Sequence, residues 1–521
     1  MRLLILAVGT SFAVCCIALA AHGSPDLRLT ADGTARVTVV VPENAGRFTR
    51  PAVDDLVRCL SAALGTQVPT ASTTAEVRTP LSILLGDAFG ADFQVCTSGL
   101  HRDGCVIKTR GKQLLITGPS DYGIANGIYT FLIDCVGVRW FAPGDLYEVI
   151  PKKPDLTLPN VDIVRNPDFS YRVFSGVTGD AGRAWLRRSR LDLDTSGLPC
   201  CGFGHNLSRI IRPSLYGKDH PEYFAMVDGK RMVVGSDDTS GPQPCFTNPD
   251  VIRIAADAAK EFFAKNPDRT TFSLGVNDGP LFCRCPNCAA LDQPQRKSKG
   301  SDAVYSDSYF YFVTEVAKIV ARSNPDRYLG CYAYRGVELP PRRIPRLPDN
   351  VTIALTQDTS QHFDPDYKQT DRDLWLAWRS TAAHVGRYDY YGLGWFTPRY
   401  FVRLAADDIK FIHANSAAGF YCEVYPNWSV TAPQLYVASR LLWDSSLDTD
   451  TLLDEYFNSL FGPAAGEMKR FYSLFEQYWA KPRPGRWFEG FADIKAELAI
   501  ADADLIEQAW QYLFKARTLV I

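Results

Sequence analysis

The chain has 521 residues, of which 46% are hydrophobic and 12% aromatic, a composition that can fill large packed cores. Its 56 basic and 58 acidic residues leave a net charge of −2, which excludes the strongly basic proteins that bind nucleic acid or membrane surfaces. A chain of this length is too long for one core, and we expect two or three domains.

The first segment, residues 1–23, has the pattern of a secretory signal peptide. Met1 and Arg2 form a positive end, an apolar run follows from Leu3 to Ala20, and small residues lead to Gly23. No later apolar run is long enough to span a bilayer. We therefore expect export of the mature chain to the periplasm, the cell surface or the medium, without membrane insertion.

Residues 24–160 are expected to form a small α/β sandwich domain. An alternating run at 35–41 predicts a strand, and 51–64 carries the apolar stripe of an amphipathic helix. A second strand is expected at 81–85, and two short runs around Arg110-Gly111-Lys112 predict a hairpin. An apolar helix over 122–135 completes the unit, and the proline-rich segment at 151–159 is typical of a linker.

Residues 165–432 alternate short apolar strands with helical segments, which predicts a (β/α)8 barrel of the TIM type. The helices include 248–265 and 306–322. The expected strands are 171–174, 202–204, 244–246, 271–276, 328–334, 351–355, 384–388 and 419–422. The segments near 202–204 and 244–246 carry the weakest strand pattern.

The remaining region, 433–521, is expected to be a helical extension. One helix ends near Trp443-Asp444, and another covers 452–460. The final helical pattern, 505–519, runs almost to Ile521, an ending that would also suit a truncated chain.

Polar residues gather where the expected barrel strands end, and barrel enzymes carry their reactive groups at these carboxyl ends. For any single residue a loop-capping role is an equal alternative, but the whole set favours a binding site. The set comprises His205, Asn277, Asp278, Tyr332, Tyr334, Gln357, Asp358, Asp389, Tyr390, Tyr391, Glu423 and Trp428.

Cleavage of a glycosidic bond requires a proton donor and a second group that attacks or stabilises the anomeric carbon. We expect Asp278 to be the acid/base and Glu423 a second essential carboxylate. Asn277 would orient the acetamido group of a substrate whose own oxygen is the nucleophile. Turn chemistry is the alternative interpretation of Asn-Asp-Gly. His205, Tyr332, Tyr334, Asp389, Tyr390 and Trp428 are the expected sugar-binding residues.

Three cysteines, Cys283, Cys285 and Cys288, follow Asp278 closely. They suit part of a structural zinc site with Cys245 or a histidine as the fourth ligand, or a local disulfide with a third thiol that is buried or paired elsewhere. No other metal or cofactor is expected. There is no glycine-rich phosphate loop and no Gly-x-Ser-x-Gly elbow of a serine hydrolase.

The ordered motifs of the chain resemble those of a known family. They are His220-Pro-Glu-Tyr-Phe-Ala, Cys245-Phe-Thr-Asn-Pro-Asp, Asn277-Asp-Gly with Cys283-x-Cys-x-x-Cys, and Tyr436-Val-Ala-Ser-Arg-Leu-Leu-Trp-Asp. This set resembles the bacterial domain of unknown function 4838, which is similar to glycoside hydrolase family 163. Gly118-Pro-Ser-Asp-Tyr-Gly and Gly137-Val-Arg-Trp resemble the N-terminal domain that precedes the barrels of family 67 α-glucuronidases and family 20 hexosaminidases.

The resemblance implies a catalytic barrel that acts as a retaining glycosidase on glycans containing N-acetylhexosamine. In the related hexosaminidases an acid or amide pair ends the fourth strand, where Asn277 and Asp278 stand here. Asp278 replaces the glutamate common in those relatives. Two alternatives remain: a glycosidase for a uronic acid, for which Arg335 and Arg387 are the candidate basic residues, and a non-catalytic glycan-binding protein.

Overall fold

The computed structural model describes residues 27–158, 160–234, 236–392, 399–487, 495 and 498–520. The expected signal peptide lies outside the described residues. Among the helices of the described part, none is long and apolar enough to cross a membrane.

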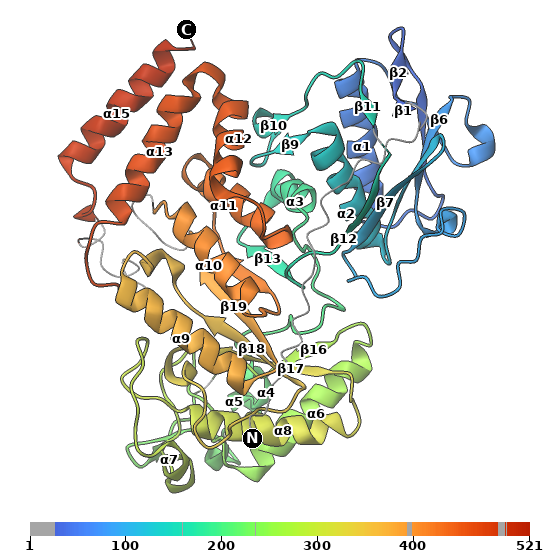
Figure 1. Ribbon diagram of the computed structural model, residues 1–521. Helices are drawn as coiled ribbons and strands as arrows, with labels where there is room; N and C mark the ends of the chain where they lie inside the picture. The colour runs from blue at the N-terminus through green and yellow to red at the C-terminus, as the bar shows by residue number, and fades with distance from the viewer. Residues whose placement is uncertain are drawn as a thin grey trace, which may run out of the picture.

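The N-terminal unit contains a six-stranded mixed sheet with the order β12-β7-β8-β6-β4-β5. Figure 1 shows α1 and α2 on the face of this sheet that is turned toward the rest of the chain. The strands are β4 (Val37–Val40), β5 (Thr70–Ala71), β6 (Leu81–Leu85), β7 (Cys105–Arg110), β8 (Gln113–Thr117) and β12 (Asp162–Arg165), and the helices are α1 (Thr49–Leu64) and α2 (Asp121–Thr130).

The expected hairpin is confirmed, with β7 and β8 antiparallel around Gly111, whose φ of 58° suits a glycine in the turn. The expected helix at 122–135 is α2 followed by a π-helical turn over Phe131–Val136. Past the proline-rich segment, β12 pairs with β7, so the sheet extends to Arg165. Short paired strands complete this part: β1 (Leu27–Arg28) with β11 (Thr157–Leu158), β2 (Thr30–Ala31) with β3 (Thr34–Ala35), and β9 (Arg139–Trp140) with β10 (Glu148–Val149).

The second unit is built on a curled, fully parallel sheet with the order β13-β20-β19-β18-β17-β16. This arrangement confirms the expected barrel-type α/β fold. Six of the eight expected strands are present: β13 (Arg172–Ser175), β16 (Thr271–Ser273), β17 (Tyr328–Ala333), β18 (Val351–Thr356), β19 (His384–Tyr390) and β20 (Phe420–Glu423).

The two weakest expected strands do not form as continuous strands within the described residues. In place of the second, His205 makes a single parallel bridge to Gly275, and the ring of Phe203 packs among Tyr332, Tyr388 and Tyr421 inside the curl. In place of the third, Pro244 makes an antiparallel bridge to Phe224. Pro242 and Pro244 have no N–H to donate, so this segment cannot continue a sheet ladder.

Helices connect the parallel strands, namely α3 (Gly179–Arg188), α6 (Pro249–Lys265), α8 (Ser306–Ala321), α9 (Pro365–Thr381) and α10 (Val402–Ala414), and α11 (Trp428–Trp443) follows the last strand. Two of these helices, α6 and α9, begin with the same kind of side-chain cap. The side chain of Asn248 accepts from the N–H of Asp250 at 2.9 Å before α6, and Asp364 accepts from Asp366 at 3.0 Å before α9. Proline follows each cap, where its missing N–H is not needed.

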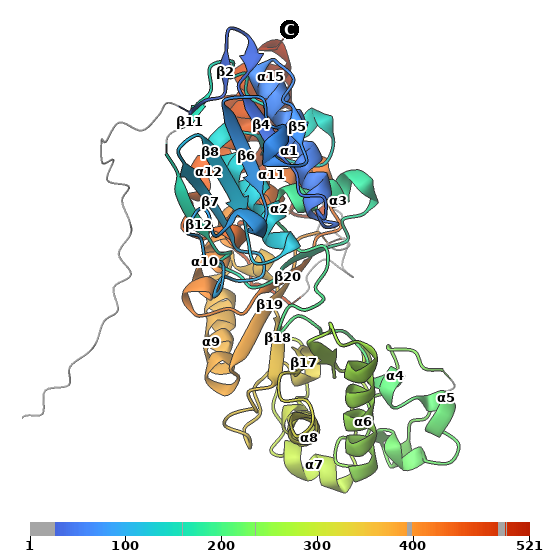
Figure 2. The same ribbon diagram turned by 90° about the vertical axis from the view of Figure 1, so that its right-hand side faces the viewer.

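Short elements form the far end of the second unit. They are α4 (Leu207–Ile210), α5 (Pro213–Tyr216), α7 (Pro286–Asp292) and the hairpin of β14 (Met226–Val227) and β15 (Lys230–Arg231). Figure 2 shows α4, α5, α6, α7 and α8 grouped at the end of the molecule away from the N-terminal unit.

The C-terminal region is helical, as expected, with α12 (Thr449–Phe461), α13 (Ala465–Trp479) and α15 (Ala503–Thr518). One hydrophobic core runs from the N-terminal unit through the barrel to α12 and α13, and α15 packs on α13 through a separate small cluster. At the junction the ring of Phe141 packs 4.8 Å from Tyr436 and 5.2 Å from Tyr456, and Arg139 pairs with Glu455 at 2.6 Å. The N-terminal unit is therefore docked on α11 and α12.

Candidate active site

The interior face of the parallel sheet carries a row of phenol groups toward its carboxyl edge. Alternate residues of a strand share a face, so Tyr388 and Tyr390 of β19 point inward together with Tyr332 of β17. Their rings lie close together, 5.7 Å from Tyr332 to Tyr388 and 5.5 Å from Tyr388 to Tyr390. Burial raises the pKa of each phenol, which leaves all three neutral hydrogen-bond donors near neutral pH.

Asp278 stands at this edge, after the end of β16, with its side chain about half exposed. The hydroxyl of Tyr334 donates to its carboxylate at 3.1 Å, and the guanidinium of Arg335 and Nε2 of His205 each lie 3.9 Å away. The carboxylate therefore has one phenol donor and one guanidinium as close neighbours. His205, Tyr334 and Asp278, which we expected at one edge of the barrel, therefore lie close together in the structure.

Asn277 has a different environment from the one expected for a substrate-binding amide. It is buried, its Oδ1 accepts from the N–H of Ser208 at 2.9 Å, and its Nδ2 donates to the carbonyl of Pro242 at 2.8 Å. Both ends of the amide are therefore used to join three chain segments. In this arrangement Asn277 holds the loop that carries Asp278 and does not face a substrate.

Glu423 ends β20 on the same interior face and accepts a short hydrogen bond from the hydroxyl of Tyr388. Burial is the main reason why the pKa of Glu423 is raised, and the negative charge of Asp278 raises it further. The hydrogen bond from Tyr388 and the nearby His205 lower this pKa and oppose part of the shift. The two carboxyl groups are therefore within electrostatic reach of each other. Glu423 is the one whose environment favours the proton.

The tautomer of His205 follows from its contacts. Its Nδ1 meets the carbonyl of Val276, which can only accept, so Nδ1 carries a hydrogen and Nε2 is the ring nitrogen turned toward Asp278. The ring lies 4.9 Å from that of Tyr332 and 5.9 Å from that of Tyr334. His205 thus joins the tyrosine row to the carboxylate.

A residue that sequence reasoning missed, Trp487, closes this site. Its ring lies 6.4 Å from that of Tyr334 and 6.2 Å from that of Tyr390. Beside it, a cavity of about 190 Å³ is lined by residues 276–280, Phe282, 300–301 and 334–336. Trp487 comes from the chain after α13, and nothing in its local sequence pattern links it to the barrel edge.

Two expected sugar-binding residues lie elsewhere. Asp389 alternates with Tyr388 and Tyr390 on β19, so it points outward to the helices, where it accepts from the N–H of Thr359 at 3.1 Å. Trp428 begins α11 and packs edge-on against Trp185 at 4.9 Å. Within the described residues, neither forms a hydrogen bond or an ion pair with Asp278 or Glu423.

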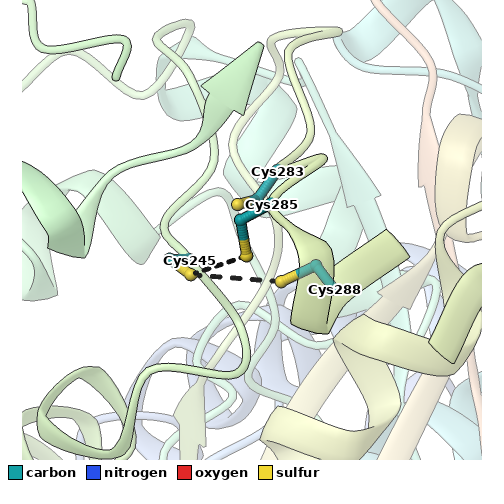
Figure 3. Close-up of side chains that lie close together, drawn as sticks. All are labelled: Cys245, Cys283, Cys285 and Cys288. Atoms are coloured by element: carbon teal, nitrogen blue, oxygen red, sulfur yellow. Dashed lines mark hydrogen bonds between the residues drawn. The ribbon is translucent and has the colours of Figure 1, made fainter. Parts of the chain in front are cut away.

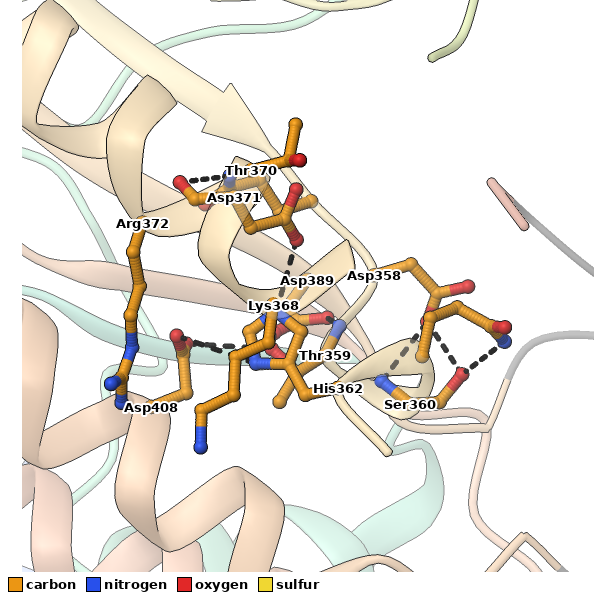
Figure 4. Close-up of polar contacts among 12 residues, drawn as sticks. Asp358, Thr359, Ser360, His362, Lys368, Thr370, Asp371, Arg372, Asp389 and Asp408 are labelled. Atoms are coloured by element: carbon orange, nitrogen blue, oxygen red, sulfur yellow. Dashed lines mark hydrogen bonds and ion pairs between the residues drawn. The ribbon is translucent and has the colours of Figure 1, made fainter. Parts of the chain in front are cut away.

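Behind the sheet lies a buried ionic cluster, which Figure 4 shows around His362. We define it by Asp358, Thr359, His362, Asp371, Arg387, Asp389 and Asp408. Arg387 pairs with Asp408, and Nε2 of His362 lies 3.0 Å from Asp371. Burial raises the pKa of Asp389 to about 7 and lowers that of His362. Arg387 is therefore engaged behind the sheet, and of the two basic candidates only Arg335 stands at the cavity.

The ionic cluster also holds one wall of the cavity. Lys299 pairs with Asp371 and lies 3.5 Å from Glu338, and its ammonium is 5.5 Å from the ring centre of Trp487. Burial lowers the pKa of Lys299 to about 8. The next residues, Gly300 and Ser301, line the cavity, so Lys299 fixes that loop against the site.

Four cysteines form the group best suited to hold a metal ion within the described residues. Cys245, Cys283, Cys285 and Cys288 are all buried, and their sulfur atoms lie within 4.8 Å of one another. Figure 3 shows the four thiols pointing toward a common centre.

Comparisons with known proteins agree with this architecture. The family model described as "domain of unknown function (DUF4838)" matches residues 142–473. A search of curated proteins found no match. A family GH115 4-O-methyl-α-glucuronidase with specificity for decorated arabinogalactans superposes with a TM-score of 0.53 and 14% identity, over 85% of this chain and 62% of that chain.

Two further structures also match, with TM-scores below 0.5. Flavobacterium johnsoniae chitobiase gives 0.45 at 12% identity over 94% of this chain and 85% of its own. Streptomyces plicatus N-acetyl-β-hexosaminidase gives 0.41 at 13% identity over 87% and 93%. The present chain spans less than two thirds of the α-glucuronidase, and that likeness shows a shared fold.

Proposed function

This chain belongs to the family described as a domain of unknown function (DUF4838), and from that premise we propose that it is a glycoside hydrolase. The observation that carries the proposal is the pair Asp278 and Glu423 at the carboxyl edge of the barrel sheet, in different surroundings: Asp278 is about half exposed beside Tyr334 and Arg335, and Glu423 is partly buried against Tyr388. Glycosidic cleavage requires two carboxyl groups with different roles.

The environments assign the roles within the pair. Glu423 is the proton donor to the leaving oxygen, because burial raises its pKa. Asp278 is the charged partner that stabilises or attacks the anomeric carbon, because Tyr334 donates to it and Arg335 lies close by. This reverses the expectation that Asp278 is the acid. Asn277 then positions Asp278 through its bonds to Ser208 and Pro242.

We further propose that the substrate is a glycan containing N-acetylhexosamine, cleaved with retention. Of the phenols beside the carboxyl pair, that of Tyr334 is engaged by Asp278 and that of Tyr332 supplies a donor for an acetamido carbonyl, and the indole of Trp487 supplies an apolar surface for its methyl group. Since the amide of Asn277 is occupied, the phenol of Tyr332 takes the orienting role that a substrate-assisted mechanism requires.

A uronic-acid glycosidase is the second candidate, and Arg335 favours it. Its guanidinium lies at the cavity, and its backbone has a φ of 46°, a conformation that is uncommon for a non-glycine residue. A guanidinium in this position could bind a sugar carboxylate by paired hydrogen bonds.

The test is hydrolysis of aryl N-acetylhexosaminides, aryl glucuronides and a complex N-glycan by the wild type, Glu423→Gln and Asp278→Asn. We expect the wild type to cleave hexosaminides and each variant to lose activity on the order of 10²–10⁴-fold. Cleavage of glucuronides alone, abolished by Arg335→Leu, would select the second candidate. Glycan binding without any cleavage would make the protein a non-catalytic binder.

We also propose that the protein is exported after removal of residues 1–23, in keeping with the sequence pattern of that segment. Expression in a bacterial host followed by cell fractionation and N-terminal sequencing tests this. A mature chain that begins near Ser24 outside the cytoplasm is the expected result, and a full-length cytoplasmic chain would contradict it.

A further inference from the structure

The cysteine cluster joins two loops that are far apart in sequence. Cys245 follows the bridge between Phe224 and Pro244, whereas Cys283 and Cys285 lie in the loop after β16 and Cys288 lies in the first turn of α7. All four are buried, in surroundings that exclude bulk water.

The sulfur spacing fits a tetrahedral metal site. Cys245 Sγ lies 3.7 Å from Cys285 Sγ and 4.0 Å from Cys288 Sγ. A zinc ion with Zn–S bonds of about 2.3 Å places the corners of its tetrahedron about 3.8 Å apart. A disulfide would bring two sulfurs to about 2.05 Å, so the arrangement is one of separate thiols around a centre.

Neighbouring groups supply hydrogen bonds that thiolate ligands need. The N–H of Met226 donates to Cys283 Sγ at 3.3 Å, and the hydroxyl of Thr247 lies 3.2 Å from Cys288 Sγ. A guanidinium nitrogen of Arg231 lies 3.8 Å from Cys283 Sγ, and the positive charge offsets part of the negative charge of a four-thiolate centre. Such outer donors orient metal ligands and stabilise their charge.

We propose that Cys245, Cys283, Cys285 and Cys288 bind one structural zinc ion. Four converging thiolates match the tetrahedral ligand set of zinc, and a closed set without a carboxylate or an open position is typical of structural sites. The ion cross-links the loop that ends at Cys245 to the loop that runs from Asn277 to α7.

The proposed cross-link also positions the loop that carries Asp278. The catalytic meaning of that positioning rests on the proposed function. Gln243, two residues before Cys245, accepts from the N–H of Asn277 at 2.9 Å and donates to the carbonyls of Asn277 at 2.8 Å and Gly279 at 3.0 Å. It therefore holds both residues that flank Asp278. The zinc site fixes Gln243 relative to Cys283, so Gln243 is a positioning residue for Asp278.

The first test is the metal content of the full chain, grown with zinc and iron in the medium and then dialysed. We expect about one zinc ion per chain in the wild type and roughly tenfold less in Cys288→Ser. Cys59→Ser removes an equally buried thiol from the N-terminal unit and is the matched control, with zinc unchanged. If Cys288→Ser does not fold, release of zinc from the wild type by a mercurial, in proportion to four titrated thiols, replaces it.

The second test replaces zinc by cobalt in the wild type, where we expect the intense thiolate charge-transfer bands of a tetrahedral sulfur site. Wild-type protein with iron in place of zinc, with two disulfides among the four cysteines, or with equal zinc in Cys288→Ser overturns the proposal.

Hydrogen exchange of residues 276–288 then tests the link to Asp278, independently of activity. We expect faster exchange there after zinc removal and no change in the N-terminal sheet. Bound zinc without any hydrolase activity would refute the proposed function alone, and hydrolase activity without zinc would refute this inference alone.

Discussion

The two faces of strand β19 place similar polar residues in opposite kinds of environment. On the inner face Tyr388 and Tyr390 pack against each other, and Tyr388 donates to Glu423. On the outer face Arg387 and Asp389 are fully buried between the sheet and α10, where Arg387 pairs with Asp408. A shift of one residue thus separates a group that can meet a substrate from one that can only meet the protein.

The two faces of β19 also differ in how their side chains contribute to stability. The buried ionic cluster must offset a large desolvation cost, so each charge there depends on its partner for folding. Glu423 is only partly buried at the end of β20, and its burial already favours the uncharged side chain. Substitutions on the outer face should therefore change stability, whereas those on the inner face should change catalysis.

The largest expected effect is on the inner face. Glu423→Gln should lower kcat/KM on the order of 10²–10⁴-fold, because it removes the proposed proton donor. Its melting temperature should remain close to that of the wild type, since burial already favours an uncharged group here. Steady-state kinetics with calorimetry checks both, and Glu315→Gln on the surface of α8 is the control. Loss of folding in Glu423→Gln would show that the pair is structural.

The complementary change is Arg387→Met on the outer face. It leaves Asp408 buried without its cation and should lower the free energy of unfolding by about 3–5 kcal/mol. Urea denaturation measures this. The exposed pair of Arg253 and Asp250 is the control, where Arg253→Met should change stability by less than about 1 kcal/mol. Equal effects at the two sites would contradict the distinction between the faces.

The pH dependence of stability sharpens the comparison through Asp389. Its folded pKa of about 7 lies above the ordinary value of 3.8, so the folded state holds the proton more tightly than the unfolded chain. Its contribution is then fully present below the unfolded pKa and is lost as pH rises through about 7. Asp389→Asn should remove this loss, on the order of 1–3 kcal/mol, between acidic and alkaline conditions.

Urea titrations of the wild type and Asp389→Asn across this pH range make the comparison. A parallel decline of stability in both proteins would place the titration elsewhere.

The smallest expected effect belongs to the cavity wall. Trp487→Ala should raise KM about tenfold with little change in kcat, because it removes an apolar surface and leaves the carboxyl pair in place. Trp487→Phe should keep most of the affinity. A fall in kcat with an unchanged KM would instead assign the indole to the transition state.

The sequence predicted the barrel-type fold and the approach of His205, Tyr334 and Asp278, because parallel strands bring their carboxyl ends to one edge. The side of the sheet to which Asp389 points depends on how far β19 continues. The expected strand ended at Tyr388, whereas the observed one runs to Tyr390, and strand alternation turns Asp389 outward. The last residue of a strand cannot be located from a sequence in which tyrosine and aspartate are mixed.

Other misses arose from contacts distant in sequence. The burial of Asn277 follows from Ser208 and Pro242, and the position of Trp487 follows from the packing of the chain after α13, neither of which leaves a local pattern. Loop 223–245, which supplies Cys245 and Gln243, was expected to hold a barrel strand. Two prolines beside Gln243 explain why it forms an anchoring loop instead.

The docking of the N-terminal unit on α11 and α12 has a consequence for how the protein unfolds. Phe141, Tyr436 and Tyr456 belong to one continuous core, so the sheet of the N-terminal unit and the barrel lose their packing together. Calorimetry should show one cooperative transition for both, in contrast to the separate transitions of domains joined by a free linker. A chain cut at the proline-rich segment would leave this aromatic surface open to self-association.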